Sequence, residues 1–391
     1  MTNAVSAITD AAFGAVGDGV TDDTAAIQAC LNAARGAVRI PWTNDFYKVS
    51  GALTIPRPGL MVFGDGADDC KIKTTSATAP VFITAAEGIV LRELWIEPLV
   101  TRASGAPYVN ITNGAGARSA SLERLVMERA ATGVRCETGF VNIEECRISL
   151  LHGYGVGVVT VAGAGLYMSR KNFIGSFDLD QLNQPYAGLL LADCGNADIS
   201  STQLLCSGFG ILGNPNSEQV CTSLLFSRVL ADHCRVGWYF SGSGSGSANN
   251  ITMNQCWGCS SVFSGLGIDG NSGNITVSDS VFSSNGITPN SVTNMPGVNI
   301  AGNANLVSLT GNIIYGHANA ADINIAGAAT GINITGGNQI GGASFPSNIG
   351  VAFSGTAHDV WVTDNTMSGH PGGHFSGSAG SNITTTPNLL R

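Results

Sequence analysis

The sequence predicts an all-β chain wound into a parallel β-helix, a single-stranded solenoid, and three observations favour this fold class. A short unit recurs between Asn249 and Asn365 with a period of roughly 22 to 30 residues, which is typical of stacked repeats. The units are rich in Val, Ile, Thr, Asn, Ser and Gly, and apolar and polar residues alternate within them, as in a half-buried strand. Gly and Asn end these runs, where a bend needs residues that tolerate positive φ.

Each unit combines a segment of the Asn-Ile-Thr kind with a bend and a second apolar pair that ends on glycine. The matching segments are Asn250-Ile251-Thr252, Asn274-Ile275-Thr276, Leu306-Val307-Ser308, Asn333-Ile334-Thr335 and Val360-Trp361-Val362-Thr363. Small or amide residues follow them, and stacked amides at an inward bend can hydrogen-bond one coil to the next. The residues that we expect at this inward bend are Asn172, Gln203, Cys256, Ser280, Asn312, Asn338 and Thr366.

An amphipathic helix is expected near the start of the chain, over residues 22–35. Thr21 is the expected N-cap, Asp22 and Asp23 lie in the first turn, where the helix dipole favours negative charge, and Gly36 ends the helix. Because turn hydrogen bonds and the dipole explain the two carboxylates, we assign them no catalytic role. The predicted apolar face of the helix consists of Ala26, Ile27, Cys30, Leu31 and Ala34.

The residues around this helix resemble a known family. The segment from Phe13 to Gln28 is followed by a strand at 38–41, a Tyr-x-Val strand at 47–49 and a Gly-x-Gly strand end at 64–66. Together they resemble the opening signature of the pectate-lyase-like superfamily, which includes bacterial polysaccharide lyases, epimerases and hydrolases and the tailspikes of bacteriophages. The resemblance implies a right-handed parallel β-helix whose N-terminal end is plugged by the helix. It covers about the first 70 residues and specifies the cap rather than the chemistry.

The rest of the chain is predicted to form about a dozen coils, and at ~4.8 Å per coil the stack would be on the order of 55 Å long. Residues 1–50 are the expected N-terminal cap, residues 51–375 the parallel β-helix and residues 376–391 a C-terminal tail. Residues 175–186 and 286–297 interrupt the even spacing of the coils. Long loops on a rigid scaffold are where binding residues accumulate.

Composition argues against several other classes of function. The formal net charge is −9 and only 12% of the residues are charged, which disfavours nucleic acid as a partner. No stretch of about 18 uninterrupted apolar residues indicates a membrane span, and the N-terminus lacks the basic start and apolar run of a secretory signal. The ten cysteines are dilute. Cys256 and Cys259 have redox spacing but lie in a β coil, and no zinc-ligand spacing is present, so neither a redox site nor a metal site is predicted.

Carboxylates are the remaining resource for catalysis, and sugar polymers are cleaved by pairs of them roughly 5 to 9.5 Å apart. Alignment of the coils places a mixed-charge column just before the inward bend, on a surface that otherwise carries little charge. We interpret this column as the wall of a groove. Its expected members are Glu145, Lys171, Thr202, Arg228, Gln255 and Asp279.

The candidate site residues lie beside this column. Asp232 and His233 are next to it. The loop that carries Asp178 and Asp180 extends from the stack of coils two coils earlier. We therefore predict Asp178, Asp180 and Asp232 as the acid and base group. The expected substrate contacts are Lys171, Arg228 and His233, with Tyr186 and Trp257 as platforms for sugar rings.

A structural interpretation of the same residues stays open. In this interpretation Asp178 and Asp180 form loop turns, and Asp232 pairs with Arg228 or Arg235. The other histidines are expected to be solvated or bonded within turns, and these are His152, His317, His358, His370 and His374.

The leading interpretation of function follows from the resemblance and the carboxylates. It is a phage tailspike-like depolymerase that binds and cleaves a bacterial surface polysaccharide (capsule, exopolysaccharide or O-antigen) by glycoside hydrolysis without a cofactor, as a homotrimer in the virion tail or outside the cell. One alternative is a polysaccharide lyase that acts by β-elimination on a uronate polymer, with Lys171 or His233 as base and calcium as a cofactor. Another is a non-catalytic glycan-binding fibre or adhesin.

Overall fold

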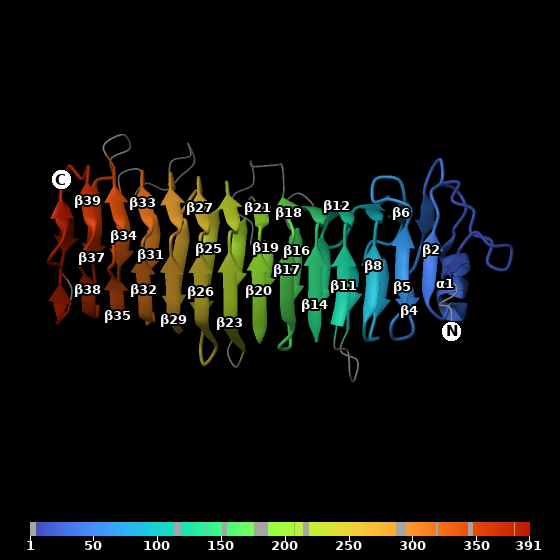
Figure 1. Ribbon diagram of the computed structural model, residues 1–391, viewed down its shortest axis with the longest axis horizontal. Helices are drawn as coiled ribbons and strands as arrows, with labels where there is room; N and C mark the ends of the chain where they lie inside the picture. Colours follow the sequence, from blue (N-terminus) through green and yellow to red (C-terminus); the bar gives the residue numbers. More distant parts are fainter. Residues whose placement is uncertain are drawn as a thin grey trace. The chain divides into compact units, whose positions relative to one another are not determined.

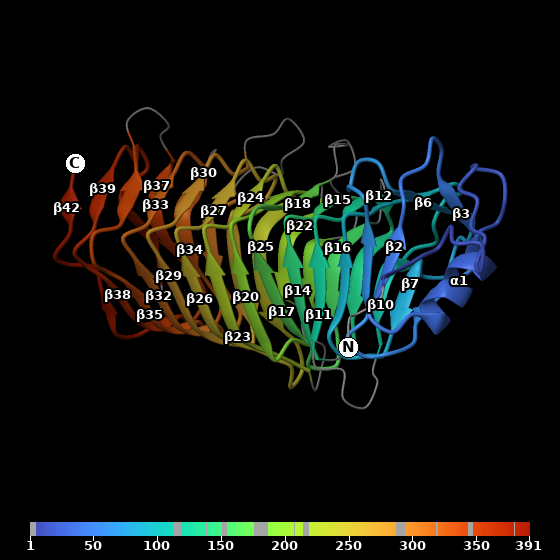
Figure 2. The ribbon, with the colours of Figure 1, turned by 45° about the vertical axis from the view of Figure 1, so that its right-hand side comes forward.

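A computed structural model describes residues 5–112, 119–137, 139–150, 155–175, 187–206, 208–213, 219–286, 295–317, 320–342, 347–378 and 380–391. The chain divides into two compact units, Met1–Ser176 and Phe177–Arg391. Each unit is a parallel β-solenoid in which successive coils add strands to three sheets, named A, B and C (Figure 1 and Figure 2). The all-β solenoid that the sequence predicts is confirmed.

The first unit contains the N-terminal strands of all three sheets. Its sheet A has the order β1 (Val5–Ala7), β2 (Ala37–Ile40), β5 (Met61–Gly64), β8 (Ile89–Arg92), β11 (Ser119–Glu123), β14 (Phe140–Glu144) and β17 (Gly165–Ser169). Its sheet B has the order β3 (Tyr47–Val49), β6 (Lys71–Thr74), β9 (Trp95–Pro98), β12 (Val126–Ala130), β15 (Arg147–Leu150) and β18 (Asn172–Gly175). Its sheet C has the order β4 (Leu53–Ile55), β7 (Phe82–Thr84), β10 (Pro107–Ile111), β13 (Thr132–Cys136) and β16 (Val156–Thr160).

The second unit repeats the arrangement. Its sheet A has the order β20 (Asn196–Ser200), β23 (Val220–Ser227), β26 (Ser247–Asn254), β29 (Ser272–Ser278), β32 (Asn305–Thr310), β35 (Thr330–Ile334), β38 (His358–Val362) and β41 (Ile383–Thr384). Its sheet B has the order β21 (Thr202–Leu205), β24 (Leu230–Asp232), β27 (Trp257–Cys259), β30 (Val281–Ser283), β33 (Ile313–Tyr315), β36 (Gln339–Gly341), β39 (Thr366–Ser368) and β42 (Leu389–Leu390). Its sheet C has the order β19 (Ala187–Leu191), β22 (Phe209–Gly213), β25 (Val236–Gly242), β28 (Leu266–Gly270), β31 (Val298–Ile300), β34 (Ala321–Ile325), β37 (Ile349–Phe353) and β40 (Phe375–Gly377).

The core consists of side chains that repeat at the same register in successive coils. Ile275 of β29 pairs in parallel with Ile251 of β26 and Val307 of β32, and all three are buried. Alternation puts every second residue inside, as the burial pattern of β29 illustrates. Each buried aliphatic side chain of this kind stabilises the fold by roughly 1.5 to 3 kcal/mol. The stack of these columns, rather than any single coil, holds the solenoid together.

The expected helix is present but shorter than predicted. Helix α1 spans Thr24–Ala33 and buries Ile27, Cys30 and Leu31. Thr21 is not its N-cap, because its hydroxyl donates to Asp18 instead, at 2.9 Å.

The two aspartates before α1 act in the turn that precedes it. Asp23 is buried, and its carboxylate accepts the backbone N–H groups of Val16 and Gly17. Asp22 accepts hydrogen bonds from the backbone and hydroxyl of Thr24. Both carboxylates therefore support the turn, as expected for residues without a catalytic role.

Stacked polar side chains at the inward bend form the expected ladder. The Asn338 amide donates to Leu309 O, Thr335 O and Asn365 Oδ1, while Asn338 Oδ1 accepts the backbone N–H of Asn312. The side chains of Asn312, Asn338 and Asn365 are buried. Such a ladder satisfies backbone groups that a strand-to-strand bend would otherwise leave unpaired.

Two of the residues expected at this bend are wrong by one position. Thr202 and Asn365 occupy the bend, whereas Gln203 and Thr366 are the next residues along, in sheet B. Because the side-chain period of a strand is two, a shift of one residue turns the side chain from the inside to the outside. Gln203 is accordingly exposed.

The last residues of the chain continue the solenoid. Strands β40, β41 and β42 each pair in parallel with the preceding strand of their sheet. Among the described residues, no helix combines the length and the apolar character that crossing a membrane would need.

Candidate functional site

A column of left-handed residues separates sheet A from sheet B in the second unit. Ser201, Arg228, Gln255 and Asp279 have φ between 47° and 54°, and successive coils place them about 4.8 Å apart. The last three are exposed. Thr202 was expected in this column, but it is the buried residue after Ser201. In the first unit, Glu145 and Lys171 have the same left-handed conformation and are exposed.

Two of the predicted substrate contacts lie together in the second unit. Arg228, Gln255 and Trp257 line a shallow surface depression of about 260 Å³, together with Val229 and Leu230. The register pairs Leu230 of β24 with Trp257 of β27, so both side chains lie on the outer face of sheet B. Trp257 is 50% exposed, and no carboxylate of the described residues pairs with the Arg228 guanidinium. An indole face and a cation are therefore both available to a ligand here.

Asp232 and His233 are in direct contact next to this depression. The imidazole Nδ1 of His233 lies 3.0 Å from Asp232 Oδ1, and the same oxygen accepts the backbone N–H of His233. Asp232 lies two residues beyond Leu230 in β24 and so faces the same side of the sheet. Asp232 therefore pairs with His233 rather than with either arginine considered from the sequence. Arg235 instead holds its guanidinium over the rings of Phe209 and Phe263.

The remaining predicted site residues are not brought to this place by the described structure. Asp178, Asp180 and Tyr186 lie outside the described residues. Lys171 belongs to the first unit and the depression to the second. Of the predicted residues, the structure therefore brings together Arg228, Asp232, His233 and Trp257.

Sequence reasoning missed a pair of carboxylates in the first unit. Glu123 of β11 and Glu144 of β14 are paired in register on the outer face of sheet A. Glu123 accepts a hydrogen bond from the hydroxyl of Ser121 at 2.9 Å, and Glu144 forms an ion pair with Arg170 at 3.0 Å. Neighbouring strands lie roughly 5 Å apart, so the two glutamates start from adjacent positions on this face. The signal was available, because each glutamate ends the strand segment of its coil.

The histidines of the second unit are a correction to the sequence analysis. His317 and His370 were expected to be solvated or turn-bonded, but both side chains are closed to solvent and lie beside the buried Asp322. His370 also contacts His374, with 3.1 Å between their Nδ1 atoms. The side chains of His317, Asp322 and His370 are closed to solvent, so these three do not face a substrate. No group of three or more His, Cys, Asp or Glu among the described residues is arranged to hold a metal ion.

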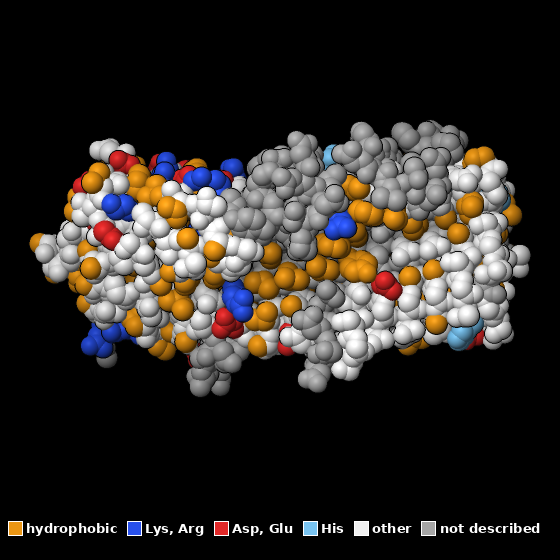
Figure 3. Space-filling model, turned by 180° about the vertical axis from the view of Figure 1, so that it is seen from behind, with side chains coloured by type: hydrophobic (Ala, Val, Ile, Leu, Met, Phe, Trp, Pro, Cys, Tyr) orange, Lys and Arg blue, Asp and Glu red, His pale blue; other side chains and the backbone are white. Residues whose placement is uncertain are grey.

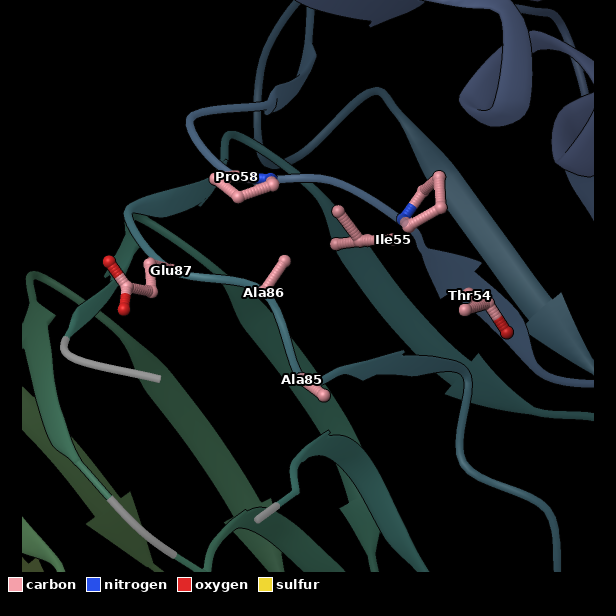
Figure 4. Close-up of a pocket in the computed structure, with 7 residues that line it drawn as sticks. Thr54, Ile55, Pro58, Ala85, Ala86 and Glu87 are labelled. Carbon is pink, nitrogen blue, oxygen red and sulfur yellow. The ribbon is translucent and has the colours of Figure 1, made fainter. Parts of the chain in front are cut away.

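A second depression lies in the first unit, between the ends of β4 and β7 and the segments that follow them (Figure 4). It has a volume of about 370 Å³ and is lined by backbone, two prolines and small side chains. Glu87 is its one ionisable lining residue and lies across the depression from Thr54. A single carboxylate among apolar groups provides no acid and base pair.

Comparison with solved structures places this fold among proteins that act on polysaccharides or belong to phage tails. The A-module of the mannuronan C-5 epimerase AlgE6 from Azotobacter vinelandii is 17% identical, with a TM-score of 0.60, over 98% of this chain and 99% of that chain. The Dettilon tailspike protein is 14% identical, with a TM-score of 0.67, over 90% of this chain and 68% of that chain. The α-1,3-glucanase from Streptomyces thermodiastaticus is 14% identical, with a TM-score of 0.54, over 100% of this chain and 69% of that chain.

Comparison by sequence found no protein-family model and no curated protein that matches the chain. The structural likeness is therefore a likeness of fold, at low identity. It agrees with the resemblance carried by the segment from Phe13 to Gln28. The chain has the parallel β-solenoid fold that tailspike proteins and pectate-lyase-like β-helix epimerases share.

Proposed function

We propose that the chain is a phage tailspike-like depolymerase that binds and cleaves a bacterial surface polysaccharide. The observation that carries the proposal is the outer face of sheet B in the second unit, where the Asp232–His233 pair adjoins the depression lined by Arg228 and Trp257. Aromatic faces stack on sugar rings, and a cation with a carboxylate fixes ring substituents. Structural relatives that are tailspikes and a glucanase support a polysaccharide as the ligand and the virion tail as the place of action.

Hydrolysis is the leading mechanism. One carboxyl group protonates the leaving glycosidic oxygen, and a second carboxylate activates water or attacks the anomeric carbon. Asp232 is proposed for one of these roles and Asp178 or Asp180 for the other. Arg228 and Lys171 bind sugar substituents, and Trp257 and Tyr186 stack on the rings.

A specific contact also favours β-elimination as a second candidate. The carboxylate of Asp232 orients the imidazole of His233 through the 3.0 Å contact, an arrangement that holds a histidine ready to accept a proton. In a uronate polymer, His233 would remove the proton next to the sugar carboxylate, a carbon–carbon double bond would form as the C–O bond to the leaving sugar breaks, and the leaving oxygen would take a proton from water. Arg228 is placed to neutralise the substrate carboxylate.

One assay separates these proposals. The protein is incubated with purified capsular, exopolysaccharide and O-antigen polymers, and new reducing ends and the absorbance of unsaturated uronates are followed. Reducing ends without absorbance support hydrolysis, both signals together support elimination, and binding without either supports a non-catalytic adhesin. Adding EDTA tests whether elimination needs calcium.

Single variants then test the residues. Asp178→Asn, Asp180→Asn and Asp232→Asn should each be compared with Asp364→Asn, an exposed left-handed aspartate of the same unit, as a matched control. Full activity in all three site variants would remove the assignment for hydrolysis. His233→Gln tests elimination in the same way.

Self-association is part of the proposal, as a homotrimer. The outer face of sheet C in the second unit carries apolar side chains in register, from Leu190 to Leu212 and Tyr239, and the rings of Phe209 and Tyr239 lie 5.7 Å apart. Figure 3, the view from behind, shows hydrophobic side chains gathered on the side opposite to sheet A. Light scattering on the purified chain gives the oligomeric mass, and Leu212→Glu should lower it if this face is the contact.

A further inference from the structure

We infer that the outer face of sheet A in the first unit holds a glycan-binding platform made of Phe140 and Tyr167. The two rings come from neighbouring strands, β14 and β17 (Figure 1). Their centroids are 5.7 Å apart, with 42° between the ring planes. Phe140 is 43% exposed and Tyr167 is 40% exposed, which is unusual for two large rings already in contact with each other. No residue of this platform belongs to the site proposed for cleavage.

The local backbone explains why the Phe140 ring lies against the sheet. Gly165 is the register partner of Phe140 on β17. A Cβ atom at position 165 would lie 2.3 Å from Cδ1 of Phe140, so the ring occupies the space that a side chain would need. The ring therefore packs over the glycine and turns its other face outward. Because β14 pairs in parallel with β11 on one side and with β17 on the other, the two rings are fixed before any ligand arrives.

Polar groups surround the two rings. Asn142, the register partner of Tyr167, donates its amide to Glu144 at 3.0 Å, and Arg170 pairs with the other carboxylate oxygen of Glu144. The Tyr167 hydroxyl has no hydrogen-bond partner among the described residues. An apolar ring face bordered by amide, carboxylate, guanidinium and hydroxyl groups matches a pyranose, which has an apolar face and a rim of hydroxyls.

The size of the apolar surface decides between a sugar and a protein as the occupant. At 43% and 40% exposure, the two residues offer on the order of 150 Å² together. A stable protein contact needs roughly 800 Å² on each side. The platform is thus far too small for a protein interface but suits one or two sugar rings of a longer polymer. It would bind the polymer independently of the residues proposed for cleavage.

The experiment measures binding of the full chain, independently of cleavage. A printed array of purified bacterial capsular, O-antigen and exopolysaccharides identifies a polymer that the protein binds, and affinity electrophoresis in gels containing that polymer gives the affinity. We expect Tyr167→Leu and Phe140→Leu each to weaken retention by about tenfold, and Tyr167→Phe to retain it, since the flat ring is kept. The control is Trp361→Leu, a 39% exposed ring on sheet A of the second unit, which should bind as the parent does.

Several outcomes would overturn the platform. The first is that the parent and the two Leu variants are retained equally in the gel, and the second is that Trp361→Leu loses as much retention as they do. The third is a changed oligomeric mass in the Leu variants, and the fourth is that the parent binds no polymer on the array. If the Leu variants melt early, Tyr167→Met keeps apolar cover over the sheet without a flat face and replaces them. Reducing ends are scored separately, so a chain that binds through these rings but does not cleave removes the depolymerase proposal and leaves this one standing.

Discussion

The imidazole Nε2 of His370 lies 2.8 Å from Oδ2 of Asp322, and neither side chain is exposed to solvent. On the other side of the same carboxylate, His317 Nε2 lies 3.7 Å from Oδ1 and has no hydrogen-bond partner among the described residues. Burial lowers the pKa of His317, and burial together with the neighbouring His370 lowers the pKa of His374. The buried imidazole of His317 therefore resists protonation, which makes the stability of the chain depend on pH.

Stability is expected to fall as the pH drops below about 6.5. As the pH falls, a histidine whose pKa is lower in the folded chain is protonated at a higher pH in the unfolded chain than in the folded chain. Its contribution to the free energy of unfolding is therefore complete above the pKa that it has in the unfolded chain. The contribution is lost as the pH falls toward the pKa that it has in the folded chain. Melting temperatures between about pH 8 and pH 5 measure the effect.

A matched pair of variants assigns this pH dependence to the buried group. His317→Asn keeps an acceptor for the Asn285 N–H, which His317 Nδ1 accepts at 3.4 Å, and removes a titrating group. It should flatten the pH dependence, whereas His358→Asn at a 44% exposed side chain should leave it steep. Equal slopes in the two variants would contradict the assignment.

The amide ladder predicts a large loss of stability in Asn338→Ala. The substitution removes three donated bonds and two accepted bonds inside the solenoid, and it leaves carbonyl groups of Leu309 and Thr335 without this donor. We expect the free energy of unfolding to fall by roughly 2 to 4 kcal/mol. Denaturant unfolding measures it. The exposed Asn333→Ala is the control and should change the free energy by less than about 0.5 kcal/mol.

A close contact of backbone predicts that Gly237→Ala destabilises the second unit. A Cβ atom at this position would lie 2.6 Å from the carbonyl oxygen of Gly265, and backbone cannot move aside as a flexible side chain can. The expected loss is roughly 1 to 3 kcal/mol. Gly342→Ala is the matched control, because no atom lies within 4 Å of its added carbon. If the two variants melt at the same temperature, the prediction for Gly237 is wrong.

The thiols are expected to be unreactive in the folded chain. All ten cysteines are free, and nine of them are buried. Burial raises the pKa of Cys256 to about 11 and that of Cys234 to about 12, so little thiolate forms at neutral pH. Titration with a disulfide reagent should label Cys259 slowly in the native protein and all ten after unfolding. Rapid native labelling of more than one thiol, or a Cys256–Cys259 disulfide, would show that the coil opens.

Part of the candidate site could be derived from local sequence. Arg228, Gln255 and Asp279 were placed in one column because a polar residue recurs just before each bend, and Asp232 and His233 are neighbours in the chain. The prediction was wrong at Ser201, where Thr202 was expected. An error of one residue in the position of the bend moves a side chain from the outer to the inner face.

Contacts between side chains of neighbouring coils could not be predicted from local sequence. Glu123 pairs with Glu144, and Phe140 lies over Gly165, only because the register of β11, β14 and β17 brings them together. Coil length varies too much to infer such a register. Equivalent bend residues are 24 residues apart between Cys256 and Ser280 and 32 apart between Ser280 and Asn312.

Alternation at a period of two and repetition of bends are properties of short segments, so they predicted the solenoid and its polar bend, and the amphipathic pattern over residues 22–35 predicted the helix. Contacts such as that between Asp322 and His370, which are 48 residues apart, arise only when coils of unequal length are stacked. Stacking sets which side chains meet and which are closed to solvent. The buried imidazole group and the exposed ring platform were therefore decided by tertiary structure, because burial and register are properties of neighbouring coils and not of any one of them.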